Sequence, residues 1–175
     1  DPLDGTTNYV HGFPYYCVSI GLEKDGTLVA GAVYNPVSEE MFLAPAGHGA
    51  TLNRQPLKCS TIDDLGDAML IASLPVATTP DDPAVARFLR VLGKAQTVQR
   101  TGSAALNLAF LAAGRVEGFW SASLKPWDMA AGVLIVQEAG GRITSLDGGR
   151  FRLDVPSLLA TNGSSLHERL TGVLS

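Results

Sequence analysis

The chain opens with the stretch DPLDGTTNYVHG, residues 1–12. Asp4 is a favourable residue to cap a helix N-terminus and Gly12 a favourable one to end it, so the stretch predicts a short helix from about residue 5 to residue 11. The free N–H groups at its start would face the carboxylates of Asp1 and Asp4. Carboxylates that bind hard cations, next to amides that bind phosphate, indicate a metal-assisted phosphate site.

Residues 1–9 resemble the first signature of the inositol monophosphatase family, part of a superfamily of lithium-sensitive, magnesium-dependent phosphatases. The signature reads approximately D-P-[LI]-D-G-T-x-N-[FY], and the chain meets every position of it. The alternative interpretation is a surface helix that an aspartate caps after a turn. The complete match favours the phosphate site.

A second stretch, WDMAAGVLIVQEAGG at residues 127–141, resembles the family's second signature, W-D-x-A-A-G-x-x-[LIV]-x-x-E-A-G-G. Pro126 predicts a helix start, and Asp128 lies in the first turn, where the helix dipole stabilises an ionised carboxylate. A fixed, ionised carboxylate suits a magnesium ligand. Taken alone, the stretch is better explained as an aspartate cap beside a core tryptophan. The two signatures, however, occur in the order that the family has.

The resemblance implies roles for individual residues. The implied metal ligands, with Mg²⁺ as the cofactor, are the carboxylates of Asp1, Asp4 and Asp128 and the backbone carbonyl of Leu3. The N–H groups of Gly5 and Thr6 are implied to contact phosphate. The Thr6 hydroxyl is implied to orient the attacking water, and Asp4 is implied to take part in catalysis and in substrate binding.

The segment RTGSAAL, residues 100–106, resembles a further family segment, in which a Gly-[ST]-Ala turn contacts the sugar-like alcohol. The resemblance implies that Gly102, Ser103 and Ala104 contact the substrate. Alternatively, Gly102 is an ordinary turn residue and Ser103 only caps the following helix.

Ser121 departs from the family pattern. Many inositol-hydrolysing members place a glutamate seven residues before the aspartate of the Trp-Asp pair, where it accepts hydrogen bonds from substrate hydroxyls. Ser121 occupies this position and is the implied substrate contact here. A hydroxyl cannot replace a carboxylate in charge or reach. We therefore expect a phosphatase for which inositol 1-phosphate is not the best substrate.

Composition excludes several classes of protein. The 175 residues, 46% of them apolar, are sufficient for one domain or two small ones with a hydrophobic core. The formal charge of -4 and the lack of any Lys/Arg cluster argue against nucleic acid as a partner. No apolar run is long enough to cross a membrane. Cys17 and Cys59 lack metal or redox spacing, so a reduced, cytoplasmic protein is expected.

Residues 15–56 have the pattern of an antiparallel meander. In residues 15–22, larger apolar side chains alternate with smaller ones and predict a strand with one buried face, made by Tyr16, Val18, Ile20 and Leu22. The Asp25-Gly26 pair predicts a hairpin. Further strands are expected at 27–34, 40–44 and about 51–52. No helix long enough to cover this meander lies nearby in the sequence.

Strands and helices alternate after residue 66. The apolar run at 68–74 predicts a strand buried on both faces. Helices are expected at 83–93, 103–113, 126–139 and 164–174, with strands at 96–99, 118–122, 142–144 and 158–160. The predicted fold is an α/β layered sandwich, with a remainder of an N-terminal α+β subdomain at 1–66 and a C-terminal α/β subdomain at 67–175. The resemblance implies the αβαβα order of the sugar phosphatases without its N-terminal helices.

The predicted function is that of a magnesium-dependent phosphomonoesterase that hydrolyses a small sugar or polyol phosphate with a metal-activated water. Fructose 1,6-bisphosphate, histidinol phosphate and 3′-phosphoadenosine 5′-phosphate remain alternative substrates, and a non-catalytic family member that binds a partner is the alternative of another class. The chain begins inside the first signature without an initiator methionine, so a fragment that is inactive by itself is expected. The resemblance implies a homodimer for the complete protein.

Overall fold

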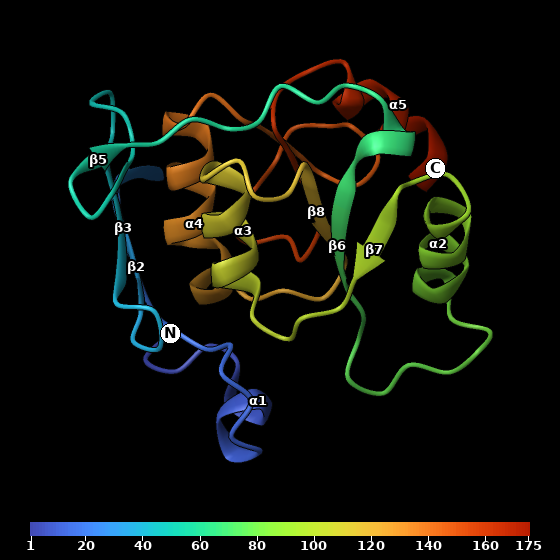
Figure 1. Cartoon of the computed structure of the whole chain (residues 1–175), viewed down its shortest axis with the longest axis horizontal. Coiled ribbons are helices and arrows are strands. Elements are labelled where there is room, and N and C mark those ends of the chain that lie inside the picture. The colour runs from blue at the N-terminus through green and yellow to red at the C-terminus, as the bar shows by residue number, and fades with distance from the viewer.

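The computed structural model describes residues 1–175 and contains two five-stranded sheets and five α-helices. Figure 1 shows four layers, which are the first sheet, a pair of helices, the second sheet and a second pair of helices. The inner pair is α3 (Ala104–Ala112) and α4 (Pro126–Glu138), and the outer pair is α2 (Pro83–Leu92) and α5 (Leu166–Leu174). The predicted layered α/β fold is confirmed.

The first sheet is an antiparallel meander in which each strand pairs with the next. Its strands are β1 (Val18–Lys24), β2 (Thr27–Asn35), β3 (Glu40–Pro45), β4 (Thr51–Leu52) and β5 (Gln55–Pro56). The predicted strands are confirmed within a few residues. The two-residue β5, which turns back on β4, was not predicted because so short a pairing has no periodicity of its own.

The predicted buried face of β1 is wrong. Val18, Ile20 and Leu22 are 37%, 64% and 57% exposed, whereas Ser19 on the other face is buried. The reason is that α4 packs against the face with the smaller side chains.

Close approach of α4 explains this choice of face. A Cβ at Gly21 would lie 2.5 Å from the Cβ of Ala130, and one at Gly31 would lie 2.7 Å from the carbonyl oxygen of Ala131. The two glycines face each other across β1 and β2. A side chain at either position would therefore push α4 away from the sheet.

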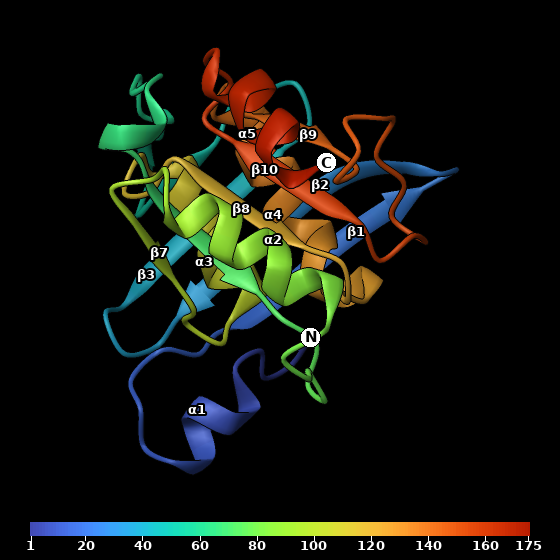
Figure 2. The same ribbon diagram turned by 90° about the vertical axis from the view of Figure 1, so that its right-hand side faces the viewer.

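The second sheet is mixed, with strand order β7-β6-β8-β10-β9. Its strands are β6 (Met69–Ser73), β7 (Thr97–Gln99), β8 (Gly118–Ser121), β9 (Arg142–Thr144) and β10 (Leu158–Thr161). β6 runs parallel to β7 and β8, whereas β10 runs antiparallel to β8 and β9. In Figure 2, α2 and α5 lie in front of this sheet. Helices on both sides explain why β8 and β10 are buried throughout, and the predicted double burial of β6 is confirmed at its three central residues.

Two apolar clusters form the core. The larger has 25 buried residues and joins the first sheet, through Val33 and Phe42, to α3, α4 and the second sheet, through Ile71 and Phe119. The smaller has 11 buried residues, which come mainly from the second sheet and the two outer helices. The larger cluster contains residues from both sides of residue 66, so it does not separate two subdomains there. The predicted division at this residue stays a prediction. None of the five helices has the length and apolar composition that a membrane span requires.

Candidate metal and phosphate site

The first signature forms a turn followed by α1 (Thr6–Val10), which projects beyond the four layers in Figure 1. The helix is one residue shorter than predicted at each end. Gly5 precedes it with a φ of 86°, a left-handed conformation that glycine adopts without strain. A Cβ at this position would also lie only 2.8 Å from the carbonyl oxygen of Tyr15. The prediction that Asp4 caps this helix is wrong, because the N-cap is Gly5 and no side chain caps it.

The side chain of Asp4 instead contacts the N-terminus of α3. Its Oδ2 accepts hydrogen bonds from the Ser103 hydroxyl at 2.6 Å and from the Ala105 N–H at 2.8 Å. Its backbone pairs with that of Cys17 in an isolated antiparallel bridge, with N···O distances of 2.9 and 3.0 Å. Asp4 is 8% exposed. Both its backbone and its side chain are therefore fixed by residues distant in sequence.

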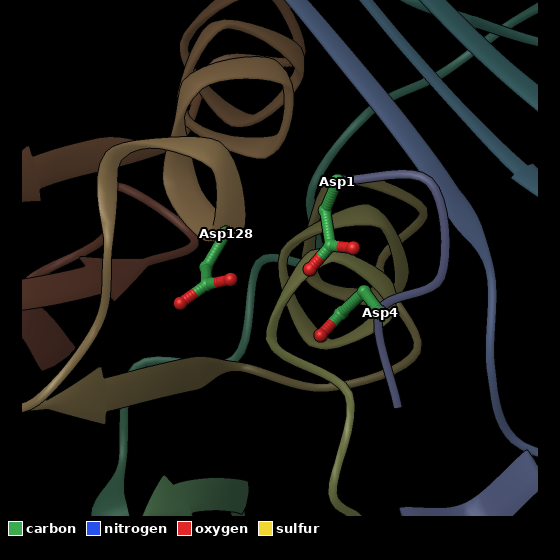
Figure 3. A group of neighbouring side chains, drawn as sticks. All are labelled: Asp1, Asp4 and Asp128. Atoms are coloured by element: carbon green, nitrogen blue, oxygen red, sulfur yellow. The ribbon is translucent and has the colours of Figure 1, made fainter. Parts of the chain in front are cut away.

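Three carboxylates converge next to this turn, as Figure 3 shows. One oxygen each from Asp1, Asp4 and Asp128 can be chosen so that all three lie within 4.8 Å of one another. Asp1 and Asp4 come from the first signature, and Asp128 comes from the first turn of α4. The structure thus brings together the three carboxylates that the two signatures contain.

Each carboxylate is held through one of its two oxygens. Asp1 Oδ1 accepts a hydrogen bond from the Leu3 N–H at 2.9 Å, and Asp128 Oδ2 accepts one from the Lys125 N–H at 2.8 Å. Asp4 is held through Oδ2 by α3. These bonds restrict the rotation of each carboxylate and leave its second oxygen available to a cation.

The cluster has a strong excess of negative charge. No lysine or arginine forms an ion pair with any of the three aspartates. Burial raises the pKa of the Asp4 carboxyl; the Ser103 hydroxyl and the Ala105 N–H oppose this shift, and the negative Asp128 adds to it. Neighbouring carboxylates repel one another unless a cation lies between them.

The donors of this cluster are all oxygen atoms. Oxygen-only sets suit the hard cations Mg²⁺, Ca²⁺ and Mn²⁺ and lack the nitrogen and sulfur ligands that zinc prefers. The carbonyl oxygen of Leu3 accepts a hydrogen bond from the Thr6 hydroxyl at 2.9 Å and keeps a second lone pair. The residues therefore fit a magnesium ion chemically.

A cavity of about 320 Å³ lies beside the cluster. Its lining includes Asp4 and Asp128 together with the three residues of the predicted substrate turn, Gly102, Ser103 and Ala104. Asp1, Leu3, Gly5 and Thr6 do not line it. The cluster and the turn are therefore neighbours in space, although Asp1 and Asp4 are about a hundred residues from the turn in the chain.

Ser121 does not line this cavity. It is fully buried at the end of β8, and its hydroxyl oxygen accepts a hydrogen bond from the Ser123 N–H at 3.3 Å. Arg100, by contrast, lines the cavity and forms no ion pair. Arg100 was not predicted as a site residue from the sequence. Its place beside the glycine turn, within a segment that resembles a substrate loop, is the signal that could have identified it.

A larger cavity, of about 740 Å³, lies between the β1–β2 hairpin, α4 and residues 150–154. Neither the three aspartates nor the substrate turn contributes to it. Its charged lining includes Arg152 and Asp154, which pair with each other at 2.6 Å. Size alone would select this cavity, but the convergence of unpaired carboxylates favours the smaller one as the functional site.

The fold and the cluster together define a layered α/β protein with a group of three carboxylates that could hold a cation. The chain belongs to the inositol monophosphatase family, whose family model matches residues 1–175.

Individual relatives agree with this assignment. The chain is 42% identical over 163 residues to the "Inositol-1-monophosphatase" of Mesorhizobium japonicum, covering 93% of the chain and 61% of that protein. It is 40% identical to the "Nus factor SuhB" of Vibrio cholerae, with the same two coverages. The chain thus spans about three fifths of the length of these curated relatives. The solved inositol monophosphatase from Anabaena superposes with a TM-score of 0.94 and is 44% identical, over 99% of this chain and 69% of that one.

Proposed function

We propose that the protein is a magnesium-dependent phosphomonoesterase that hydrolyses a small sugar or polyol phosphate. The convergence of Asp1, Asp4 and Asp128 without a cationic partner is the observation that carries this proposal. Membership of the inositol monophosphatase family and the relative with that name support it.

In this proposal Asp1, Asp4, Asp128 and the carbonyl of Leu3 bind Mg²⁺. Bound Mg²⁺ supplies Lewis acidity toward the phosphate group and toward the attacking water. The aspartates contribute negative charge in fixed orientations, because one oxygen of each accepts a hydrogen bond from within the protein. Their geometry is thus set before a cation arrives.

The phosphate group would contact the N–H groups of Gly5 and Thr6. The first N–H groups of a helix have no partner within that helix, so they are available to phosphate oxygens. Because α1 has only five residues, these two donors matter more than its dipole. The Thr6 hydroxyl donates to the carbonyl of Leu3, so its oxygen can accept a hydrogen bond from the attacking water and orient it.

The alcohol part of the substrate would occupy the cavity beside the substrate turn. The backbone of Gly102, Ser103 and Ala104 would contact it there, and Ser121 would influence it only from the buried end of β8. The unpaired guanidinium of Arg100 favours a substrate that carries a second anionic group, for which fructose 1,6-bisphosphate is a candidate. Inositol 1-phosphate, which lacks such a group, is expected to be a poorer substrate.

We also propose that the protein is a homodimer in a reducing compartment and has no nucleic-acid partner. The exposed apolar side chains of β1 support a homodimer, and the net charge of -4 speaks against a nucleic-acid partner. The free thiols of Cys17 and Cys59 support a reducing, cytoplasmic environment.

The test is phosphate release, by protein expressed at the length of its curated relatives and with saturating Mg²⁺, from glycerol 2-phosphate, inositol 1-phosphate and fructose 1,6-bisphosphate. Asp128→Asn should reduce kcat/KM by at least about 100-fold, since changes to mere neighbours of metal ligands already reduce metal affinity or activity by about 10- to 100-fold. The matched control is Asp25→Asn in the β1–β2 turn, where φ is 51° and asparagine is tolerated. A wild-type protein expressed at the length of its curated relatives that binds Mg²⁺ but releases no phosphate from any substrate would contradict the enzyme and support the non-catalytic alternative.

A further inference from the structure

Asp4 differs from the other two carboxylates of the cluster in how it is held. Asp1 and Asp128 accept hydrogen bonds from N–H groups two and three residues away. The hydrogen bonds to Asp4 Oδ2 come from Ser103 and Ala105, which are 99 and 101 residues away, and the backbone of the adjacent Gly5 adds a smaller stabilisation of the carboxylate. The orientation of Asp4 therefore depends on the packing of the first signature against α3.

The Ser103 hydroxyl is fully used by contacts inside the protein. Ser103 is 1% exposed, its single hydroxyl proton is donated to Asp4 Oδ2 at 2.6 Å, and its oxygen accepts a hydrogen bond from the Leu106 N–H at 3.4 Å. The last bond makes Ser103 the N-cap of α3. A hydroxyl that donates its only proton to Asp4 has none left to donate to a substrate.

Asp4 Oδ2 is also enclosed on its other side. The thiol of Cys17 lies 3.9 Å from Oδ2 and 3.7 Å from the Ser103 hydroxyl oxygen, and Cys17 is buried. Together with the Ala105 N–H, these groups surround Oδ2 with protein atoms. None of these contacts is made to Oδ1, which leaves Oδ1 as the oxygen that we expect Asp4 to offer to a cation.

We infer that Ser103 is a positioning residue for the cation site, which holds Asp4 Oδ2 on the N-terminus of α3 so that Oδ1 alone faces the cation. The Ala105 N–H contributes the second bond of this anchor. The inference rests on the proposed function in assigning Asp4 to that site. It gives the Ser103 hydroxyl a role through Asp4, and it leaves contact with the substrate to the backbone of the turn.

Ser103→Ala removes the anchoring hydroxyl and should weaken Mg²⁺ binding, measured by calorimetry on the wild-type and variant chains, by about 10- to 100-fold. In protein expressed at the length of its curated relatives, kcat at fixed subsaturating Mg²⁺ should fall by a similar factor, with KM for glycerol 2-phosphate changing less than about threefold. Ser103→Thr keeps the hydroxyl and should restore Mg²⁺ affinity. Ser103→Gly preserves a favourable N-cap without the hydroxyl and should behave as the alanine variant does, even if alanine impairs folding.

The control for a general loss of stability is Asp82→Ala, which removes the N-cap of α2, where Asp82 accepts a hydrogen bond from the Ala84 N–H at 2.7 Å. This variant should melt at a lower temperature than wild type but bind Mg²⁺ with unchanged affinity. Wild-type Mg²⁺ affinity in both Ser103→Ala and Ser103→Gly would overturn the inference, and so would a rise confined to KM. Weaker Mg²⁺ binding in a protein that hydrolyses no substrate would support the positioning role and contradict only the proposed enzyme.

Discussion

The two sheets differ in how many of their faces are covered. The second sheet has helices on both sides, and its strand β8 is buried along its whole length. The first sheet has α4 on one side and exposes apolar side chains of β1 on the other. In the second sheet, a continuous apolar run was enough to predict burial. In the first sheet, alternation showed which residues share a face but not which face a helix covers.

The largest expected effect is in the doubly covered sheet. Phe119 in β8 is fully buried in the larger core cluster, so Phe119→Ala should lower the free energy of unfolding by about 3–5 kcal/mol. Urea denaturation followed by circular dichroism measures this change. The matched substitution on the open face of β1, Leu22→Ala, should lower it by less than about 1 kcal/mol, because Leu22 is largely exposed. Equal losses of unfolding free energy in the two variants would contradict the proposed difference between the two sheets.

The second prediction concerns His167, which α5 buries against the second sheet. Its Nε2 lies 3.0 Å from the hydroxyl of Thr144, which donates its own proton to the carbonyl of Ser145. Nε2 must therefore carry the proton, and Nδ1 accepts a hydrogen bond from the Thr161 hydroxyl at 2.8 Å. A second proton on the ring would reverse this last bond, and the Thr161 hydroxyl proton would lose its acceptor.

Burial lowers the pKa of His167 from its ordinary value of 6.5 to about 4, and the nearby Arg142 contributes. Between these values the unfolded chain binds a proton that the folded protein does not, so stability decreases as the pH falls from about 6.5 to about 4. The loss amounts to about 3 kcal/mol for this group. Urea titrations at several pH values should show a weaker pH dependence in His167→Gln than in wild type. The same dependence in both would contradict the assignment.

The third prediction tests the covered face of the first sheet. Gly31→Ala places a methyl group against the carbonyl of Ala131 in α4, so helix and sheet must separate slightly. Overpacking of this kind typically lowers the free energy of unfolding by about 1–3 kcal/mol. The control is Gly26→Asn in the adjacent hairpin turn, where no atom lies near the new Cβ and asparagine tolerates the positive φ. An unchanged free energy of unfolding in Gly31→Ala would contradict the close packing of α4 on the sheet.

The smallest effect is expected on the open face. Ile20 is 64% exposed, so Ile20→Thr should change the free energy of unfolding of the chain by no more than about 0.5 kcal/mol. Urea denaturation at several protein concentrations would sharpen the comparison. A loss above about 1.5 kcal/mol that grows with concentration would show that a second copy covers this face.

The sequence by itself determined the elements after residue 66 and the residue types of the site. Caps, glycine stops and apolar runs act over a few neighbouring residues, so α2, α4 and β6 form close to their predicted bounds. The carboxylates of Asp1 and Asp128 are likewise held by N–H groups close to them in the chain, and both signatures could be recognised from their residues alone.

Only the tertiary structure decided which face of β1 is buried, where Asp4 is anchored and which residues share a cavity with it. Asp4 contacts α3, which is about a hundred residues later in the chain. Gly21 and Gly31 allow the close approach of α4, which is about as far away in sequence. Arg100 lies beside Asp4 and Asp128 only because the same packing brings these segments together. Local pattern contains no information on such partners, because the free energy that selects them comes from burying surfaces that meet only after the layers have assembled.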